Sequence, residues 1–285
     1  MISVLQTYDV TTGERKVLRR FDEHIEAPNW GMDGTFLVYN SQGHIFRYDL
    51  QSGESAQIDT GICTRCNNDH LSFDGKWIGI SSGVDGDGAS RVWTVPLTGG
   101  QPRQITPLKP SYLHGISPDG KTLAYCAERN GNFDVYTRSA DGTGEETRLT
   151  TAEGLDDGPE FSPCGTYIWF NSVRSGLMQA FRMKADGSEQ TQMTDDDRNN
   201  WFPHVSPDGK QVVFVSYYKD DVAPGDHPAN KNICIRRMSA EGGPIETLIA
   251  TDPEKGEKGG QGTMNVNSWS PDSRKFAFVT YVFED

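Results

Sequence analysis

Cysteine, positive charge and long apolar runs are all scarce in this sequence, and each shortage excludes a class of protein. The five cysteines are an odd number without the spacing of a disulfide framework, which indicates a reducing compartment. The 27 Lys and Arg against 40 Asp and Glu give a net charge of -13, which disfavours nucleic acid and anionic membranes as partners. Residues 1–10 lack the features of a secretory signal, and the apolar stretches 212–215 and 276–283 are too short to span a bilayer. We therefore expect a cytoplasmic protein.

A six-residue phrase recurs along the chain and sets its organisation. Its clearest forms are Ser-Pro-Asp-Gly at 117–120 and 206–209 and Ser-Pro-Cys-Gly at 162–165. The six copies occupy residues 29–34, 70–75, 115–120, 160–165, 204–209 and 268–273. Pro restricts φ, Asp accepts backbone N–H bonds within a turn, and Gly adopts positive φ without steric cost. Each copy is therefore predicted to be a strand, a tight turn and the start of a second strand.

A third and a fourth strand follow each pair, with a further turn such as Ala185-Asp-Gly-Ser188 between them. Six four-stranded antiparallel meanders are the content of a six-bladed, all-β propeller. Successive phrases are 41, 45, 45, 44 and 64 residues apart, and the span from Ser273 through the C-terminus to Gly34 is 46 residues. The ring should therefore close in register as one domain of residues 1–285. Its last blade would combine residues 1–20 with residues 266–283, so that strands from both termini protect the seam.

The Ser-Pro-Asp-Gly phrase at blade spacing resembles the repeat of the TolB-like β-propeller family, over essentially the whole chain. The resemblance implies the propeller alone, because the N-terminal α/β domain of TolB has no counterpart here. Similar propellers lie beneath the catalytic domain of prolyl-oligopeptidase-type peptidases, which need a Gly-x-Ser-x-Gly elbow that this chain lacks.

One face of the ring is predicted to carry the binding site. The long 64-residue interval places extra length in residues 217–231, between a second and a third strand, and in residues 250–265, between two blades. Both insertions belong to the face opposite the repeated phrase, which we call the upper face. The six histidines also fall in or next to connections on this face. Insertions on one side of a rigid scaffold commonly form binding sites.

The innermost strands supply the candidate ligand-binding residues. Polar residues at their start alternate with the apolar set Trp30, Leu71, Ile116, Phe161, Val205 and Trp269, so one set should pack between blades while the other faces the channel. The candidates are Asn29, His70, His114, Asp157, Glu160, Trp201, His204, Gln261, Asn265 and Asn267. Hydrogen-bonding groups beside an aromatic ring suit sugars or other small polar ligands.

The chain also resembles, more distantly, the oligogalacturonate lyase propellers, in which a Gln-x-Thr-His-x-His segment holds a divalent metal. Gln261-Gly-Thr263 matches the start of that segment, but Met264 and Val266 stand where the histidine ligands would be. Gly158 occupies the place of the catalytic base. The Cys63-Thr-Arg-Cys66 pair has no second pair to complete a metal site. We therefore expect no metal and no cofactor.

Two functions remain open from the sequence. The first is a monomeric binding module whose upper face and channel mouth hold a small polar ligand, such as a carbohydrate, or a protein segment. The alternative is a carbohydrate-active lyase or hydrolase, metal-dependent or not, that uses the histidines and Glu160 at the channel mouth.

Overall fold

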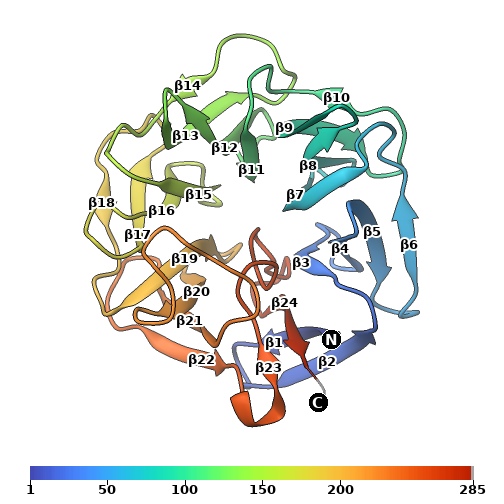
Figure 1. Ribbon diagram of the computed structural model, residues 1–285, viewed down its shortest axis with the longest axis vertical. Coiled ribbons are helices and arrows are strands. Elements are labelled where there is room, and N and C mark those ends of the chain that lie inside the picture. The colour runs from blue at the N-terminus through green and yellow to red at the C-terminus, as the bar shows by residue number, and fades with distance from the viewer. Residues whose placement is uncertain (284–285) are drawn as a thin grey trace.

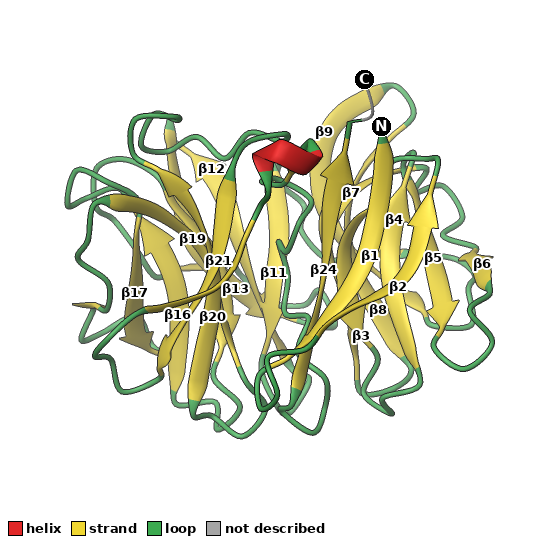
Figure 2. Ribbon diagram, turned by 90° about the horizontal axis from the view of Figure 1, so that it is seen from below, coloured by secondary structure: helices red, strands yellow, loops and turns green. Residues whose placement is uncertain are grey.

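Six separate four-stranded antiparallel sheets make up the described part of the chain, residues 1–283 of the computed structural model. Figure 1 shows the sheets arranged as blades around a central axis, and Figure 2 shows their strands running along that axis. This arrangement confirms the predicted six-bladed β-propeller. No helix within residues 1–283 is long and apolar enough to cross a membrane.

In the first five blades the strands follow chain order from the axis outward. Blade one contains β3 (Glu26–Trp30), β4 (Phe36–Ser41), β5 (His44–Asp49) and β6 (Ser55–Ile58). Blade two contains β7 (Arg65–Phe73), β8 (Trp77–Val84), β9 (Asp87–Pro96) and β10 (Arg103–Gln104). Blade three contains β11 (Ser111–Ile116), β12 (Thr122–Arg129), β13 (Asn132–Ser139) and β14 (Thr147–Arg148). Blade four contains β15 (Asp156–Phe161), β16 (Tyr167–Ser172), β17 (Gln179–Lys184) and β18 (Thr191–Gln192). Blade five contains β19 (Arg198–Val205), β20 (Gln211–Tyr218), β21 (Ile233–Ser239) and β22 (Glu246–Ala250).

The sixth blade joins the two ends of the chain. Its strand order is β2 (Arg15–Phe21), β1 (Ile2–Asp9), β24 (Lys275–Val282) and β23 (Glu257–Lys258). The β1 strand pairs with β24 along its whole length, from Ile2 opposite Val282 to Asp9 opposite Lys275. This pairing confirms that strands from both termini close the ring. The start of β1 and the end of β24 therefore lie at the same end of the ring (Figure 2).

The innermost position of blade six is less regular than the sequence predicts. We expect two strands from residues 266–283, but only β24 is continuous, and Trp269 meets Phe276 in an isolated bridge. Residues before this bridge make part of their backbone hydrogen bonds within the segment itself. The Gly262 N–H donates to Asn265 Oδ1 at 2.8 Å, and the Thr263 N–H donates to the Gly260 carbonyl at 2.9 Å. The segment still accepts single bonds from β24, from the Val279 N–H to the Thr263 carbonyl at 3.1 Å and from the Ala277 N–H to the Ser268 carbonyl at 2.9 Å, but it forms no continuous second strand.

The repeated phrase forms the turns between first and second strands, as predicted. In blade three the Gly120 N–H donates to the Ser117 carbonyl at 2.8 Å. The Asp119 carboxylate accepts the Ser117 hydroxyl at 2.6 Å and the Lys121 N–H at 3.1 Å. Because these turns join first to second strands, they lie on the lower face of the ring, opposite the second-to-third hairpin that carries the first insertion.

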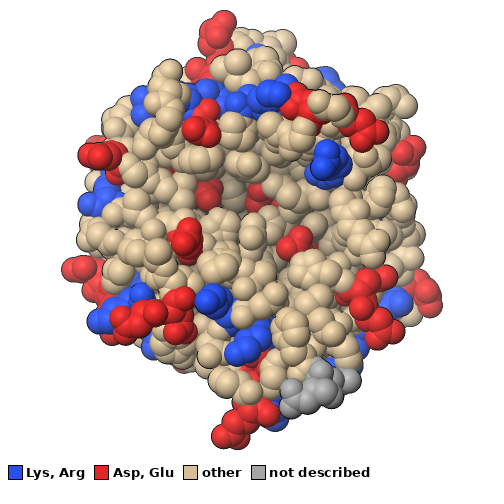
Figure 3. All heavy atoms as spheres, viewed as in Figure 1, with Lys and Arg blue, Asp and Glu red and all other residues tan. Residues whose placement is uncertain are grey.

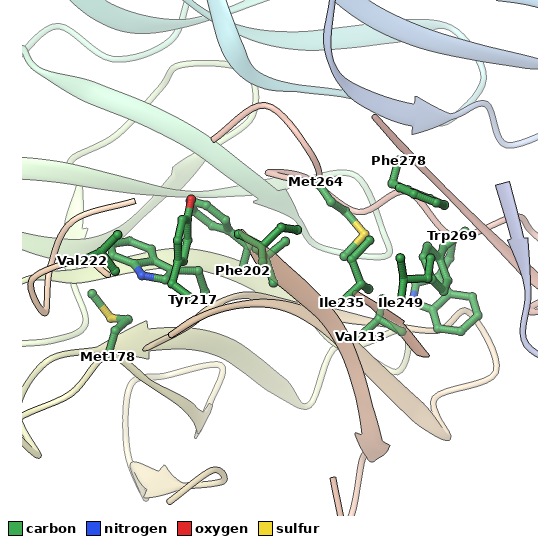
Figure 4. Packing of buried hydrophobic residues seen from close by; sticks show 14 residues of the cluster. Met178, Phe202, Val213, Tyr217, Val222, Ile235, Ile249, Met264, Trp269 and Phe278 are labelled. Atoms are coloured by element: carbon green, nitrogen blue, oxygen red, sulfur yellow. The ribbon is translucent and has the colours of Figure 1, made fainter. Parts of the chain in front are cut away.

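Apolar side chains fill the spaces between neighbouring blades. The largest cluster joins blades four, five and six, and Figure 4 shows its members as sticks. Tyr217, Val222 and Phe202 lie toward one end of this view, while Trp269, Ile249 and Phe278 lie toward the other. Burial on this scale makes the blades a rigid scaffold on which the loops of the upper face are positioned.

A bulge interrupts the innermost strand at the same place in five blades. The pairing with the second strand shifts between Glu26 and Asn29, Cys66 and His70, Leu113 and Gly115, Asp157 and Glu160, and Trp201 and His204. A bulge leaves residues unpaired and redirects their side chains. The period-two alternation seen beside the repeated phrase therefore does not extend to the start of these strands.

Candidate functional site

The bulges direct side chains into a cavity at the upper end of the central channel. This upper cavity has a volume of about 300 Å³. Its lining residues are Asn67, Asn68, Asp69, Tyr112, His114, Cys126, Phe133, Leu155, Asp157, Phe202, His227 and Gln261. In Figure 3 the centre of the face is hollowed, and acidic side chains are visible within the hollow.

Three of the ten predicted site residues line the upper cavity, namely His114, Asp157 and Gln261. A second cavity, of about 320 Å³, opens at the lower end of the channel. Asn29, Glu160 and Asn267 line this lower cavity, and His114 borders both. The remaining four, His70, Trp201, His204 and Asn265, are buried and line neither cavity.

His114 is the centre of the polar groups in the upper cavity. Its Nε2 lies 3.1 Å from Asp157 Oδ1 and 3.9 Å from Asp69 Oδ1. Its Nδ1 lies 3.3 Å from the Asn265 carbonyl oxygen. Both ring nitrogens therefore face acceptors, which favours the doubly protonated imidazolium. Asn265 thus contributes its backbone carbonyl rather than the side chain that the sequence suggested.

The electrostatics of this group follow from burial and from close opposite charges. Burial disfavours the charged form of His114, but the carboxylates of Asp157 and Asp69 outweigh it and raise its pKa to about 9. Burial also opposes ionisation of Asp157, yet the His114 charge holds the pKa of that carboxyl at about 2. The charge of Asp69 is less well balanced by the His114 charge, since burial and the Asp157 charge raise the pKa of Asp69 to about 6.

Aromatic side chains form the walls of the upper cavity. The Phe202 ring stacks on the His114 ring, with centroids 5.6 Å apart. Phe202 holds a left-handed backbone conformation, with φ of 55°, and its N–H donates to Asn171 Oδ1 at 2.9 Å. A bulky residue in this conformation is uncommon and concentrates at sites under functional constraint. In this backbone conformation the Phe202 ring lies against the His114 imidazolium.

The two insertions lie side by side at the edge of the upper cavity, as predicted. Lys231 and Gly259 form a backbone bridge, and the Gln261 N–H donates to the Pro228 carbonyl at 3.3 Å. The first insertion brings His227 to the cavity, where its ring packs against Trp201 with centroids 4.4 Å apart. Burial lowers the pKa of His227, although Asp157 partly offsets this effect.

The polar residues beside the repeated phrase mainly connect neighbouring blades. Glu160 Oε2 lies 2.6 Å from His204 Nδ1, and Glu160 Oε1 accepts from the Val205 N–H at 2.9 Å and from Asn267 Nδ2 at 2.7 Å. Asn29 likewise accepts the backbone N–H of Ser72 at 2.8 Å. These side chains therefore hold adjacent blades together around the channel.

The apolar set does not pack only between blades. Trp30, Leu71, Ile116, Phe161, Val205 and Trp269 all line the lower cavity. The lower cavity thus combines this apolar set with the polar side chains of Asn29, Glu160 and Asn267, while the charged groups His114, Asp157 and Asp69 lie together at the upper end. The bulges explain the difference, because they change which side chains face the channel between the two ends.

His70 is fully buried, and neither of its ring nitrogens has a hydrogen-bond partner among residues 1–283. Burial lowers its pKa to about 4, so the imidazole is neutral at physiological pH. Within residues 1–283 no group of three or more His, Cys, Asp or Glu side chains is arranged to hold a metal ion.

Sequence reasoning missed several residues that line the upper cavity. Asn67 and Asn68 lie in the bulge of β7, and the Asn67 amide donates to Asp69 Oδ2 at 2.8 Å. Tyr112, Phe133 and Phe202 form its aromatic walls. A run of polar residues within an otherwise apolar innermost strand, such as Asn67 to Asp69, is the signal that could have identified the first group.

Comparison with known proteins gives consistent relatives. A family model for the TolB β-propeller domain matches residues 110–232. An uncharacterised protein of Agrobacterium fabrum is 44% identical over 283 residues, which is 99% of this chain and 93% of that protein. The Tol-Pal system protein TolB of Francisella tularensis is 28% identical over 70% of this chain, which spans only 47% of that protein.

Solved structures show the same fold. A structure described as a putative TolB from Agrobacterium tumefaciens has a TM-score of 0.93 and 44% identity, covering 100% of this chain and 99% of that one. TolB from Acinetobacter baumannii has a TM-score of 0.66 and 18% identity, covering 85% of this chain and 61% of that one. An oligogalacturonate lyase in complex with manganese has a TM-score of 0.57 and 13% identity, covering 99% and 97%. The last two are similar in fold alone.

Proposed function

Because this chain belongs to the TolB-like β-propeller family, we propose that it is a binding module whose upper cavity holds a small polar ligand. The convergence of bulge residues from several blades on one cavity carries the proposal. Asn67 to Asp69, His114, Asp157 and Phe202 come from four different blades and meet there. Bulges beside a cavity redirect side chains for binding, whereas a merely structural channel needs no such interruption of its strands.

The enclosure of the cavity supports a small ligand over an extended one. The insertion that carries His227 and the connection that carries Gln261 contact each other at its edge. A protein segment remains compatible if it presents one side chain or its terminus to the cavity. In both cases the binding energy would come from desolvated polar groups together with aromatic contact.

A thermal-shift screen tests the proposal. The full chain would be heated with neutral sugars, uronates, amines and short peptides, because a ligand that binds the native state raises Tm with its concentration. Gln261→Trp fills the edge of the cavity, while Gln51→Trp places the same side chain on an exposed turn of blade one. We expect a ligand to stabilise the wild type and Gln51→Trp but not Gln261→Trp. Equal stabilisation of both variants, or no stabilising compound at all, would contradict the proposal.

Catalysis on carbohydrate is a second candidate, and one observation favours it. The carboxyl groups of Asp69 and Asp157 have pKa values of about 6 and about 2, and separated pKa values are typical of acid and base partners. Incubation with polygalacturonate and with neutral glycans, followed by a reducing-end assay, would detect cleavage. A rate that Asp69→Asn abolishes would support the enzyme. Equal rates for the wild type and this variant would reject it.

A further inference from the structure

We infer that the ligand of the upper cavity is an organic cation, an ammonium group on an apolar or aromatic body, with the Asp69 carboxylate as its counter-ion. This inference rests on the proposed function and names the chemical class of its ligand. Three features of the cavity support it: side-chain atoms without hydrogen-bond partners, the balance of charge in the lining, and the apolar and aromatic walls.

The first observation is an acceptor without a donor. Asp69 is only 5% exposed, and its Oδ2 accepts from the Asn67 amide at 2.8 Å. Its Oδ1 has no donor within hydrogen-bond distance among residues 1–283, since the nearest charged atom, His114 Nε2, is 3.9 Å away. The neighbouring Asn68 is 4% exposed, lines the same cavity, and makes no side-chain hydrogen bond within the described residues. Both residues line the cavity, so these side-chain atoms are positioned to form hydrogen bonds with a ligand inside it.

The second observation is the balance of charge. The lining contains two carboxylates and His114, and no Lys or Arg is among the described residues that form it. His114 is the partner of Asp157, at 3.1 Å, so the Asp69 charge is the one left without close compensation. A buried carboxylate without a close counter-charge is costly, and a bound cation would reduce that cost. An anionic sugar or a phosphate would add to the same cost.

The third observation is the nature of the walls. Tyr112, Phe133, Leu155 and Phe202 give the cavity apolar and aromatic surfaces next to the acidic group. Aromatic faces attract cations as well as apolar groups. An ammonium group attached to a hydrocarbon or aromatic body therefore matches both parts of the lining, whereas a free metal ion would leave the walls without contact.

Binding should also depend on pH through Asp69. Burial raises the pKa of Asp69 to about 6, so below this pH the carboxyl is protonated and an incoming ammonium must displace its proton to solvent. The titratable groups around Asp69 are His114 and Tyr112 of β11, Cys126 of β12, Asp157 of β15, Glu26 of β3 and His227 of the first insertion. Affinity for a cation is therefore expected to fall about tenfold between pH 7.5 and pH 5.

Three probes of similar shape and different charge test the inference by calorimetric titration of the full chain at pH 7.5. They are 2-phenylethylamine, which is cationic, 2-phenylethanol, which is neutral, and 3-phenylpropionate, which is anionic. We expect the amine to bind at least about tenfold more tightly than the other two, the range for a hydrogen bond to a charged group. Asp69→Asn should weaken the amine by a similar factor and remove its pH dependence. Asp85→Asn, on an exposed hairpin outside the cavity, should do neither.

The outcomes separate this inference from the proposed function. If the alcohol or the propionate binds as tightly as the amine, or if Asp69→Asn binds the amine normally, the organic cation is the wrong class. The same holds if neutral sugars or uronates stabilise the wild type through the cavity while the amine does not. The proposed function survives these outcomes if Gln261→Trp, but not Gln51→Trp, weakens the compound that does bind. If no compound of any class binds, both the inference and the proposed function fail.

Discussion

His204 Nδ1 lies 2.6 Å from Glu160 Oε2, and this contact joins blade five to blade four inside the channel wall. Glu160 is 5% exposed and His204 is 3% exposed, so the contact is shielded from bulk water. The sequence predicted both as ligand-binding residues, but their position gives them a role in holding blades together. They remain candidates for contact with a ligand only through the lower cavity, which Glu160 lines.

His204→Ala should therefore destabilise the protein rather than weaken a ligand alone. It leaves one oxygen of the buried Glu160 without its donor, which costs about 1–3 kcal/mol, in addition to the cavity left by the ring. The free energy of unfolding, measured by denaturant titration, is the readout. His44→Ala, on a partly exposed hairpin, should change it by less than about 0.5 kcal/mol. Equal stability of the two variants would show that the contact contributes nothing.

Gly158→Ala should be more damaging than another alanine at a positive φ. Gly158 has a φ of 63°, and a Cβ there would lie 2.7 Å from Asn171 Oδ1 and 2.9 Å from Phe202 Cδ1. Gly131 has a φ of 80°, but a Cβ there would meet nothing within 4 Å. Both substitutions add backbone strain, and only the first also overpacks the wall of the upper cavity. We expect Gly158→Ala to lose about 1–3 kcal/mol more than Gly131→Ala in the same denaturant titration. Similar losses would mean that Phe202 moves freely.

The repeat allowed the fold to be predicted because each copy of the phrase specifies its own turn. Ser117, Asp119 and Gly120 satisfy one another through bonds within a few residues, so the turn needs no information from the rest of the chain. The closure of the ring could also be predicted, since the 46-residue span across the termini is close to the 41 to 45 residues of the regular intervals. The pairing of β1 with β24 follows from that length.

The candidate site was harder to predict from the sequence, because it depends on bulges and on loops that are distant along the chain. Phe202 adopts a left-handed conformation that its side chain disfavours, and the Asn171 side chain that accepts its N–H belongs to another blade. No local pattern indicates such a bulge. His227 reaches the cavity through an insertion whose path is fixed by contacts with residues 259–261. Alternation counted from the repeated phrase therefore placed His204 at the channel mouth, whereas its ring is buried against Glu160. His114 and Asp157, chosen because they border the innermost strands in the sequence, line the upper cavity.

The seam between the termini should depend on the buried face of β1. Leu5 is fully buried in a cluster with Val279 of β24, so Leu5→Ala should cost about 2–5 kcal/mol. Val17, on the neighbouring strand β2, is 46% exposed, and Val17→Ala should cost less than about 1 kcal/mol. Thermal and denaturant unfolding of both variants would measure the difference. A small effect of Leu5→Ala would mean that the ring does not need the N-terminal strand for stability.

Cys164 should be the most reactive thiol of the chain near neutral pH. It takes the place of Asp in the repeated phrase, so it receives turn bonds that elsewhere hold a carboxylate. The Ser162 hydroxyl, followed by Thr166, lowers its pKa to about 7. Cys63 and Cys66 are buried, and burial raises their pKa values to about 12 and about 11. A disulfide reagent at pH 7.5 should modify about one thiol rapidly, and Cys164→Ser should abolish that phase. Rapid modification of the Cys164→Ser variant would contradict this assignment.

The stability of the native state should fall at alkaline pH because of His114. Its folded pKa of about 9 lies above the ordinary value of 6.5, so its contribution is complete below pH 6.5 and is lost as the pH rises through 9. The loss should be of the order of 2 kcal/mol, given the burial of His114 beside Asp157. Cys164 has the opposite effect on stability over the same pH range, because its folded pKa is lowered. The measurement therefore belongs in a Cys164→Ser background.

The free energy of unfolding at pH 6.5 and pH 9 would be compared with that of His114→Gln in the same background. We expect the histidine protein to lose more stability than the glutamine variant, and parallel curves would show that His114 is not held as an imidazolium between the two carboxylates.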